Sequence, residues 1–328
     1  MAALSKQQLT EFQDLANNNH VIVRALTVLQ PAASVENEKR IAAWCERSLA
    51  AERDRIEKAL SMLHRICDAL ERNGCPVAVI KSLDHWPDLG SDLDLYTAAD
   101  ALRVEHVMNK EFHAYPVERS WGDRLAQKWN YRVPDLPELV EIHIQFLGQT
   151  GEHAELARRV IERRIAKTVD GQIFRAAAPE ERIVISALQR VYRHFYFRLC
   201  DMVDNADLLE SGFVDFDELR RAATSAGIWP GVATFLCLIQ NYIEAYGGML
   251  DLPPETLIAA HSPDSHVRVG AGYLRVSKVI AASLYGSQLM RAGLRHDVRA
   301  LLRLPLLPPL AVSALVAHAL TGNDKGIW

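Results

Sequence analysis

The chain has 328 residues, and 49% of them are hydrophobic, which is enough to bury a sizeable core. Its length favours more than one packed domain. The 37 Lys and Arg residues face 41 Asp and Glu residues, so the net charge of −4 provides no basic excess of the kind that indicates a nucleic-acid partner.

The first part of the chain, residues 1–73, is predicted to be helical. Between residues 46 and 72, apolar side chains recur mostly at steps of three and four, which is the period of an amphipathic helix. Asn73-Gly74 ends this helix, because glycine suits the left-handed cap. Residues 77–80 (Val-Ala-Val-Ile) then form a short apolar run typical of a buried strand.

Two later segments alternate between polar and apolar side chains, the period of a strand. The first places Asp92 and Asp94 on one face. The second, residues 138–146, places Glu141 and His143 on one face and apolar residues on the other. Between the two segments we expect a helix and two strands, near residues 98–110, 114–118 and 127–133.

Beyond Gly151 the periodicity becomes helical, apart from a hairpin over residues 168–176 that turns at Asp170-Gly171. Pro179 opens a long helix that is predicted to run to about Leu209. The fold class is therefore α+β with a small mixed sheet. Its expected parts are an N-terminal helical region (1–73), an α/β core (74–177) and a helical domain (178–328).

Residues 304–317 are very apolar and carry no charge. A bilayer span needs about 20 residues, and Pro305, Pro308 and Pro309 interrupt this run. We therefore predict no transmembrane segment and interpret the run as a Pro-broken connection into a buried terminal helix. The alternative is a surface that docks on a membrane or a partner.

The five cysteines show no CxxC spacing, and their odd number argues against a complete disulfide framework. The first residues lack the apolar core of a signal peptide. Both observations favour a cytoplasmic protein with reduced thiols.

Asp92 and Asp94 are candidate ligands for a divalent cation. Asp92 and Asp94 leave a strand from the same face, with Cα atoms roughly 6.5–7 Å apart. Carboxylates this close repel one another, and a divalent cation relieves the repulsion. Hard oxygen ligands suit Mg²⁺, which also takes ligands from substrate phosphates. With Glu141 from the second strand, three carboxylates can hold the two ions of a nucleotidyl transfer, although an Asp-x-Asp pair alone is also common as solvated alternation on an edge strand.

Three runs together carry a resemblance: residues 79–82 (Val-Ile-Lys-Ser), 92–95 (Asp-Leu-Asp-Leu) and 140–143 (Val-Glu-Ile-His). They resemble the nucleotidyltransferase superfamily with its polymerase-β-like fold, and more narrowly the bacterial "uncharacterised nucleotidyltransferase" family. That family pairs a strand ending in Lys-Gly with a Ser-Asp-Ile-Asp-Leu strand and a later Asp-Leu-His strand. The resemblance extends over about residues 75–245 through Pro179-Glu180-Glu181, His194, Arg198 and Asp201.

The resemblance implies a role for each residue. Asp92 and Asp94 would hold two Mg²⁺ ions, and Glu141 would complete the second ion's site and polarise the acceptor hydroxyl. Lys81 and Ser82 would contact the β- and γ-phosphates of a nucleoside triphosphate. The acceptor would be gripped by the helical remainder.

The sequence also departs from the pattern. Superfamily members carry Gly-Ser after the first strand, where a helix N-terminus meets the triphosphate, whereas this chain has Lys81-Ser82. Glu141 stands in place of Asp. Ser91 is assigned to the nucleotide site, although it can simply shape the turn, and His143 is expected to orient Glu141 or to contact the acceptor.

Two further groups have both a functional and a structural interpretation. His194, Arg198 and Asp201 fall on one face of the predicted long helix, so they can seal the nucleotide site or form a buried ion network. Three aromatic side chains can stack a base, but ordinary sheet packing is the favoured interpretation for them: Trp121, Trp129 and Tyr131.

The sequence thus predicts a Mg²⁺-dependent enzyme that moves a nucleoside monophosphate from an NTP, ATP being one candidate, to an unidentified acceptor hydroxyl or phosphate and releases pyrophosphate. A small-molecule acceptor is slightly favoured over nucleic acid because the chain is mildly acidic. One alternative is a catalytically degenerate protein that binds a nucleotide or a partner, which Lys81-Ser82 motivates. Another is a toxin-like tRNA nucleotidyltransferase.

Overall fold

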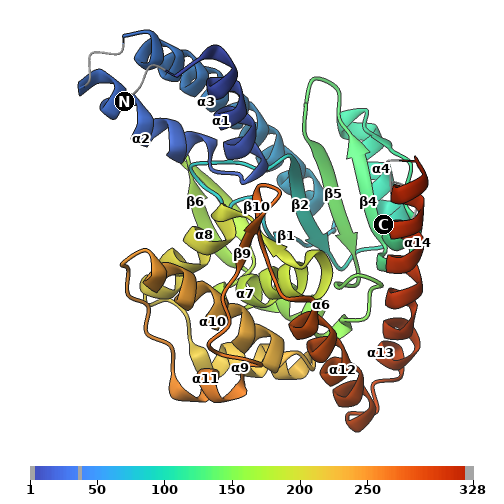
Figure 1. Cartoon of the computed structure of the whole chain (residues 1–328). Coiled ribbons are helices and arrows are strands. Elements are labelled where there is room, and N and C mark those ends of the chain that lie inside the picture. Colours follow the sequence, from blue (N-terminus) through green and yellow to red (C-terminus); the bar gives the residue numbers. More distant parts are fainter. Residues whose placement is uncertain (1–3, 36–38, 322–328) are drawn as a thin grey trace.

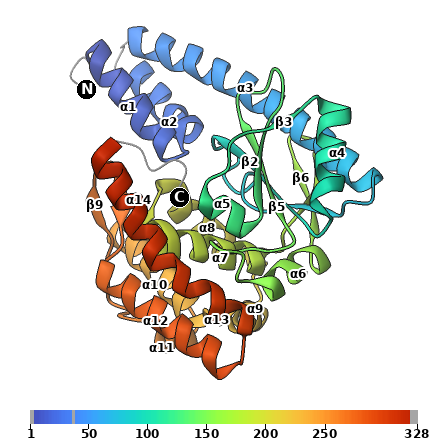
Figure 2. The same cartoon turned by 90° about the vertical axis from the view of Figure 1, so that its right-hand side faces the viewer.

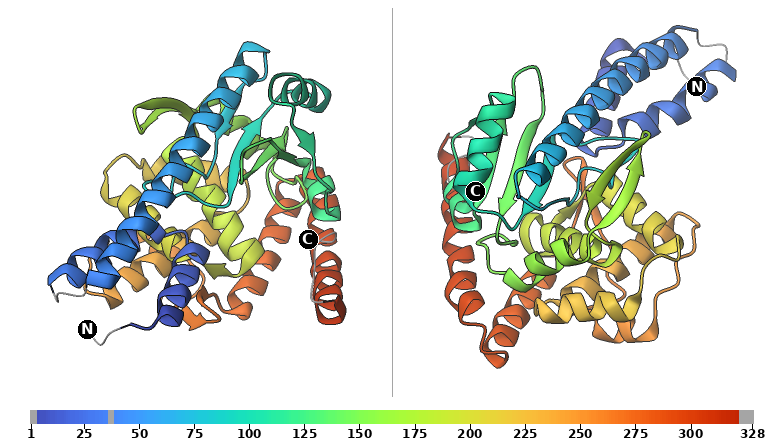
Figure 3. Two further views of the ribbon diagram at one scale, coloured as in Figure 1. Left: turned by 90° about the horizontal axis from the view of Figure 1, so that it is seen from above. Right: turned by 180° about the vertical axis from the view of Figure 1, so that it is seen from behind.

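The computed structural model describes residues 4–35 and 39–321. The first three helices form an N-terminal arm, and the long third helix of this arm continues along one face of a sheet (Figures 1 and 3). The third helix buries Ile56, Leu60 and Leu63 in the main core, as its periodicity predicts. The arm consists of α1 (Lys6–Asn18), α2 (Ile22–Val35) and α3 (Lys39–Arg72).

A mixed seven-stranded sheet forms the centre of the molecule, which confirms the predicted α+β class. The strands are β1 (Val77–Val79), β2 (Asp92–Thr97), β3 (Tyr115–Pro116), β4 (Lys128–Arg132), β5 (Leu139–Ile144), β6 (Ile165–Val169) and β7 (Gln172–Ala176). Their spatial order is β3-β4-β5-β2-β1-β7-β6. The β2/β5 and β1/β7 pairs are parallel, and the other neighbouring pairs are antiparallel.

Opposite faces of this sheet belong to different cores because successive side chains of a strand alternate in direction. Leu93 and Ile142 join the core under α3, whereas Ala78, Ile80 and Tyr96 join the core of the helical half. The sheet is thus covered on both faces (Figure 2). The helices within the α/β part are α4 (Ala101–Phe112), α5 (Trp121–Ala126) and α6 (Ala154–Glu162).

The long helix predicted from Pro179 to about Leu209 is interrupted. It comprises α7 (Pro179–Ala187), the π-helix η1 (Leu188–His194), the short strand β8 (Tyr196–Phe197) and α8 (Leu199–Glu210). The break falls at Phe195, whose left-handed backbone (φ 57°) ends the π-helix. His194 and Arg198 therefore do not share a helix, since Arg198 is the residue that caps α8. π-Helical turns often occur at functional sites, and this one faces the carboxylates.

The rest of the helical half is built as predicted, with one addition. Helices follow in the order α9 (Phe216–Ser225), α10 (Trp229–Ala245), α11 (Pro254–Ala259), α12 (Lys278–Leu294), α13 (Val298–Arg303), the 3-10 turn η2 (Leu304–Leu306) and α14 (Leu307–Thr321). The addition is a three-stranded sheet in which β10 (Tyr273–Arg275) pairs with both β8 and β9 (Arg268–Gly270). Each of these strands has only two or three residues, so it carries no readable periodicity.

The terminal apolar segment is an exposed helix, so the predicted burial is wrong. Leu315 and Leu320 of α14 are 71% and 80% exposed, and the helix lies at the outer edge of the molecule (Figures 1 and 2). Pro308 and Pro309 fall in its first turn, where the missing N–H groups are not needed. Residues 298–321 form a helical run with an 18-residue window of mean hydropathy 1.8, long and apolar enough to cross a membrane by length and composition alone.

Candidate active site

The three predicted carboxylates lie on the central parallel pair of strands. In the register of β2 and β5, Asp94 is directly paired with Glu141. Asp92 lies two residues before Asp94 and therefore on the same face. This face points to the helical half, so the carboxylates are enclosed instead of solvated: Asp94 is 9% and Glu141 8% exposed.

A cavity of about 220 Å³ opens at these carboxylates. It collects the predicted residues Lys81, Ser82, Ser91, Asp92, Asp94 and Glu141. The opposite wall comes from η1 and from the residues before α8. Lining residues that the sequence interpretation missed or left as a weaker option are His20, His85, Lys128, Arg190, Arg193, His194 and Arg198.

Two lysines compensate the charge of the carboxylates. Lys81 forms an ion pair with Asp94, and its Nζ also lies 3.6 Å from Glu141 Oε1. Lys128 Nζ lies between Asp123 Oδ1 (2.8 Å) and Glu141 Oε2 (2.9 Å). Lys128 opens β4 directly opposite His143 in the antiparallel pair, so it projects on the face that His143 shares with Glu141.

These contacts move the pKa values of the three carboxyls in different directions. Burial raises the pKa of Asp94 to about 7, against the opposing charge of Lys81, and the negative charge of Glu141 adds to the rise. Burial, and then Glu141, also raise the pKa of Asp92. Although burial disfavours its charged form as well, Lys81, Lys128 and His143 hold the pKa of Glu141 well below its usual range. Glu141 is thus the ionised carboxylate, and Asp94 is the carboxyl that titrates near neutral pH.

The two serines are engaged with the strand that carries the aspartates. Ser82 Oγ accepts a hydrogen bond from the Asp94 amide (2.6 Å) and donates to the Asp92 carbonyl (3.2 Å). Ser91 Oγ donates to the Asp92 carboxylate at 3.3 Å. Turns follow Ser82 in place of the helix that the resemblance implies at this point. Lys81 is therefore the nearer candidate for a phosphate contact, and the phosphate role of Ser82 stays a prediction.

A family model described as "Uncharacterised nucleotidyltransferase" matches residues 5–244. The chain belongs to this family. The match includes the N-terminal arm, which the resemblance seen in the sequence did not cover. The chain is thus a nucleotidyltransferase by family, and its carboxylate cavity lies within the matched part.

Solved structures give distant matches. The antibiotic-resistance factor ANT(2'')-Ia has 12% identity and a TM-score of 0.37, covering 52% of this nucleotidyltransferase and 91% of that chain. An antigenic nucleotidyltransferase-like protein from Paracoccidioides brasiliensis has 15% identity and a TM-score of 0.36, covering 61% and 96%. A search of curated proteins found no match.

The donor set of the nucleotidyltransferase fits a hard divalent cation. Asp94, Glu141 and His143 each offer one ligand atom, and these atoms all lie within 4.8 Å of one another. Two carboxylates suit Mg²⁺, and Asp92 adds a third at the same cavity. Lys81 contacts both Asp94 and Glu141, so an ion bound between them would require the ammonium group to move.

His143 is hydrogen-bonded to Glu141, and its predicted role in orienting that carboxylate stays a prediction. Its Nε2 lies 2.9 Å from Glu141 Oε1, and its buried Nδ1 has no hydrogen-bond partner within the described structure. Burial lowers the pKa of His143, so the imidazole is neutral and Nε2–H donates to the carboxylate.

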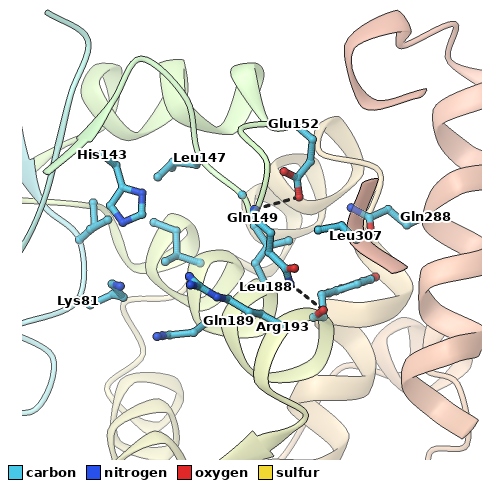
Figure 4. A pocket seen from close by; sticks show the side chains of 14 residues that line it. Lys81, His143, Leu147, Gln149, Glu152, Leu188, Gln189, Arg193, Gln288 and Leu307 are labelled. Atoms are coloured by element: carbon cyan, nitrogen blue, oxygen red, sulfur yellow. Dashed lines mark hydrogen bonds between the residues drawn. The ribbon is translucent and has the colours of Figure 1, made fainter. Parts of the chain in front are cut away.

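His143 also lines a second, smaller cavity of about 60 Å³. Figure 4 shows Lys81 and His143 at one end of this cavity and Gln288 and Leu307 at the other. Lys81, Gln189 and Arg193 line both cavities, so the two are adjacent. A small polar group placed in the second cavity would lie next to the carboxylate site.

The wall opposite the carboxylates is basic and carries neutral histidines. Burial and the charge of Arg198 lower the pKa of His20 to about 2. Burial, and then Arg193, hold the pKa of His194 well below its usual range. The positive charge of this wall therefore comes from its arginines.

Two of the three aromatic residues, Trp129 and Tyr131, pack in the sheet as predicted, whereas Trp121 lies on α5 and is 64% exposed, so sheet packing is wrong for it. Trp129 and Tyr131 stack with ring centroids 6.3 Å apart, and Arg119 lies 4.1 Å above the Trp129 ring. Both rings point away from the carboxylate face, because β4 presents Lys128 there. Tyr131 is fully buried in the core under α3.

Proposed function

We propose that this nucleotidyltransferase moves a nucleoside monophosphate from an NTP, with ATP as the first candidate, to an acceptor hydroxyl or phosphate and releases pyrophosphate. The observation that carries this is the pairing of Asp94 with Glu141 across parallel strands, beside Asp92, at a cavity whose opposite wall is basic. Mg²⁺, when bound, would activate the attacking oxygen and screen the charge of the leaving pyrophosphate.

Each residue has a part in this proposal. Asp92, Asp94 and Glu141 hold the metal, and Glu141 polarises the acceptor hydroxyl while His143 keeps the carboxylate in place. Lys81 leaves Asp94 for the β- and γ-phosphates. Ser82 and Ser91 position the strand entry that carries the aspartates, and a contact of either hydroxyl with the phosphates is part of the proposal. Because reaction needs only positioning and charge stabilisation, no covalent nucleophile is required.

We favour a small-molecule acceptor. The cavity adjoining His143 measures about 60 Å³, which suits one functional group better than a nucleic-acid strand. A second candidate function is nucleotide binding without turnover. It is favoured by the ion pair of Lys81 with Asp94, which occupies the position that a metal needs.

Thermal unfolding with each NTP, with and without Mg²⁺, tests the proposal. A ligand that binds only the folded chain at a hundredfold excess over its Kd adds about 2.7 kcal/mol of stability. We expect a Mg²⁺-dependent rise in Tm for the wild type and its loss in Asp92→Asn/Asp94→Asn. A shift that does not need Mg²⁺ and survives in the double variant would favour binding without turnover, and no shift with any NTP would contradict both candidate functions.

Affinity for the Mg²⁺–NTP complex is expected to depend on pH. Burial raises the pKa of Asp94 to about 7, so below this pH the carboxyl must lose a proton before it can bind a metal. The Kd should fall as the pH rises from 6 to 7, by up to tenfold per unit, and level off above pH 8. In the free protein, folding stability changes with pH in the opposite direction. The contribution of Asp94 to the free energy of unfolding is full below the pKa of this carboxyl in the unfolded chain, and it is lost as the pH rises through 7.

Isothermal titration at pH 6, 7 and 8 measures this dependence. The matched control is the same nucleotide without metal, which carries its own protonation but does not require ionised Asp94. Equal pH profiles for the two ligands would contradict a metal role for Asp94.

A further inference from the structure

Two histidines and a cysteine from distant parts of the chain meet beside the nucleotide cavity. His20 lies between α1 and α2, His85 lies in the turns after β1, and Cys200 lies in the first turn of α8. Each offers one ligand atom, and these atoms all lie within 4.8 Å of one another. The two imidazole rings meet edge to face, with centroids 5.3 Å apart.

A buried carboxylate orients one of these imidazoles. Asp204 Oδ2 lies 2.6 Å from His85 Nδ1, and Asp204 itself is 8% exposed and held by Arg24 at 2.7 Å. Although burial disfavours its charged form, Cys200 and Asp204 hold the pKa of His85 well above its usual range, so a metal bound at Nε2 must displace the proton there while Nδ1–H keeps donating to Asp204. A histidine that binds a metal through one nitrogen commonly donates its other N–H to a carboxylate in this way.

We propose that His20, His85 and Cys200 form a binding site for a Zn²⁺-type ion, separate from the Mg²⁺ site of the carboxylates. Two imidazoles and a thiolate are ligands that zinc accepts and magnesium does not. Three protein ligands leave one tetrahedral position for a water or another oxygen ligand. His20 and His85 also line the 220 Å³ cavity, so this fourth position faces the space that a nucleotide would enter.

The ion would connect the N-terminal arm to the rest of the molecule. His20 comes from the arm, His85 from the α/β core and Cys200 from the helical half, so one ion would tie three segments together. Arg198 Nη1 lies 3.4 Å from His20 Nδ1, and the ion must displace this long contact or bind the other nitrogen after the ring turns. The alternative is a hydrogen-bonded thiol, imidazole and carboxylate group that needs no metal.

Cobalt binding to the full chain, freed of metal with a chelator, tests the site directly. Co²⁺ occupies zinc sites and reports its ligands in the absorption spectrum. We expect one Co²⁺ per chain at this site, reported by a sulfur-to-cobalt charge-transfer band in the near ultraviolet that Co²⁺ at the carboxylate site would not give, together with tetrahedral bands in the visible region. Stoichiometric Zn²⁺ should remove both, and metal should raise the Tm.

Variants separate this site from the carboxylate site. Cys200→Ser should lose the charge-transfer band, and Cys200→Ser and His85→Gln should each weaken Co²⁺ binding at least 100-fold. Asp204→Asn should weaken it by about 10–100-fold because it only orients His85. Asp94→Asn should keep the full cobalt spectrum, so the outcome does not depend on the proposed nucleotidyl transfer.

Other results would overturn the proposal. These are a chelator-treated chain that binds no Co²⁺ at tens of micromolar, or a charge-transfer band that survives in Cys200→Ser. If Cys200→Ser does not fold, His20→Gln provides the second test because His20 lies in a connection between helices and is not fully buried. Unchanged cobalt affinity in a folded His20→Gln variant would also contradict the site.

Discussion

Asp94→Asn is expected to slow nucleotidyl transfer by about three orders of magnitude, measured as pyrophosphate release from ATP with Mg²⁺ and a metabolite extract as the source of acceptors. The asparagine keeps the shape of the side chain but removes the charge that, in the proposed function, would hold the metal. A loss of three powers of ten corresponds to about 4 kcal/mol of transition-state stabilisation, which is within the range that metal catalysis contributes. The variant should stay folded, because burial already favours the uncharged form of Asp94.

Asp170→Asn is the matched control. It makes the same substitution at an exposed turn where the left-handed backbone suits asparagine, and it should keep full activity. A folded Asp94→Asn variant within tenfold of the wild-type rate would show that Asp94 does not hold the catalytic metal. A wild-type chain that binds ATP and releases no pyrophosphate would instead support the degenerate alternative.

The largest expected loss of stability comes from the buried ion pair of the helical half. Arg190 is 2% exposed, and its Nε lies 2.7 Å from Asp201 Oδ2, which also accepts a hydrogen bond from the Arg198 amide. Asp201→Asn would leave a buried guanidinium without its counter-charge. Removing one partner of such a pair costs about 3–5 kcal/mol, which should appear in the free energy of unfolding from urea titration.

Asp207→Asn, on the exposed side of the same helix, should change stability by less than about 0.5 kcal/mol. The double variant Arg190→Met/Asp201→Leu should recover part of the loss, since apolar side chains can replace a buried ion pair. A loss below about 1 kcal/mol for Asp201→Asn would contradict the assignment of Asp201 as the main counter-charge of Arg190.

The acidic half of the candidate site was predictable because it rests on local pattern. Asp92 and Asp94 share a face by strand periodicity, and Glu141 has the same alternation in another strand. The alternation of polar and apolar residues does not predict which lysine forms an ion pair with each carboxylate. Lys128 meets Glu141 only through the antiparallel register of β4 and β5, and Lys81 reaches Asp94 only because β1 lies beside β2.

The basic wall was less predictable for the same reason. His20 reaches the cavity from the first helices, far from the carboxylates in sequence, and no spacing connects them. His194 and Arg198 were placed on one helix, but Phe195 breaks it without a Gly or Pro signal. Both residues still line the cavity, because the π-helix and the cap of α8 present them from two elements.

The C-terminal helix shows another limit of pattern. A run that is apolar on all sides is compatible with burial, with a membrane or with a partner, and its sequence does not choose among them. The prolines were interpreted as interruptions, although in α14 they start the helix. Their position relative to the helix start, and not their presence, decides their effect.

The division of the cavity into an acidic and an arginine-bearing wall also affects how a substrate would approach. Lys81 and Lys128 offset part of the carboxylate charge, and the remaining opposite charges on the facing walls produce an electric field that runs across the cavity. A metal–triphosphate complex is itself polar, with a cation on one side and phosphate oxygens on the other. We expect this field to turn the complex, before any contact forms, so that its metal faces Asp92, Asp94 and Glu141. The electric field of the cavity would then provide much of the orientation that the triphosphate needs for in-line attack.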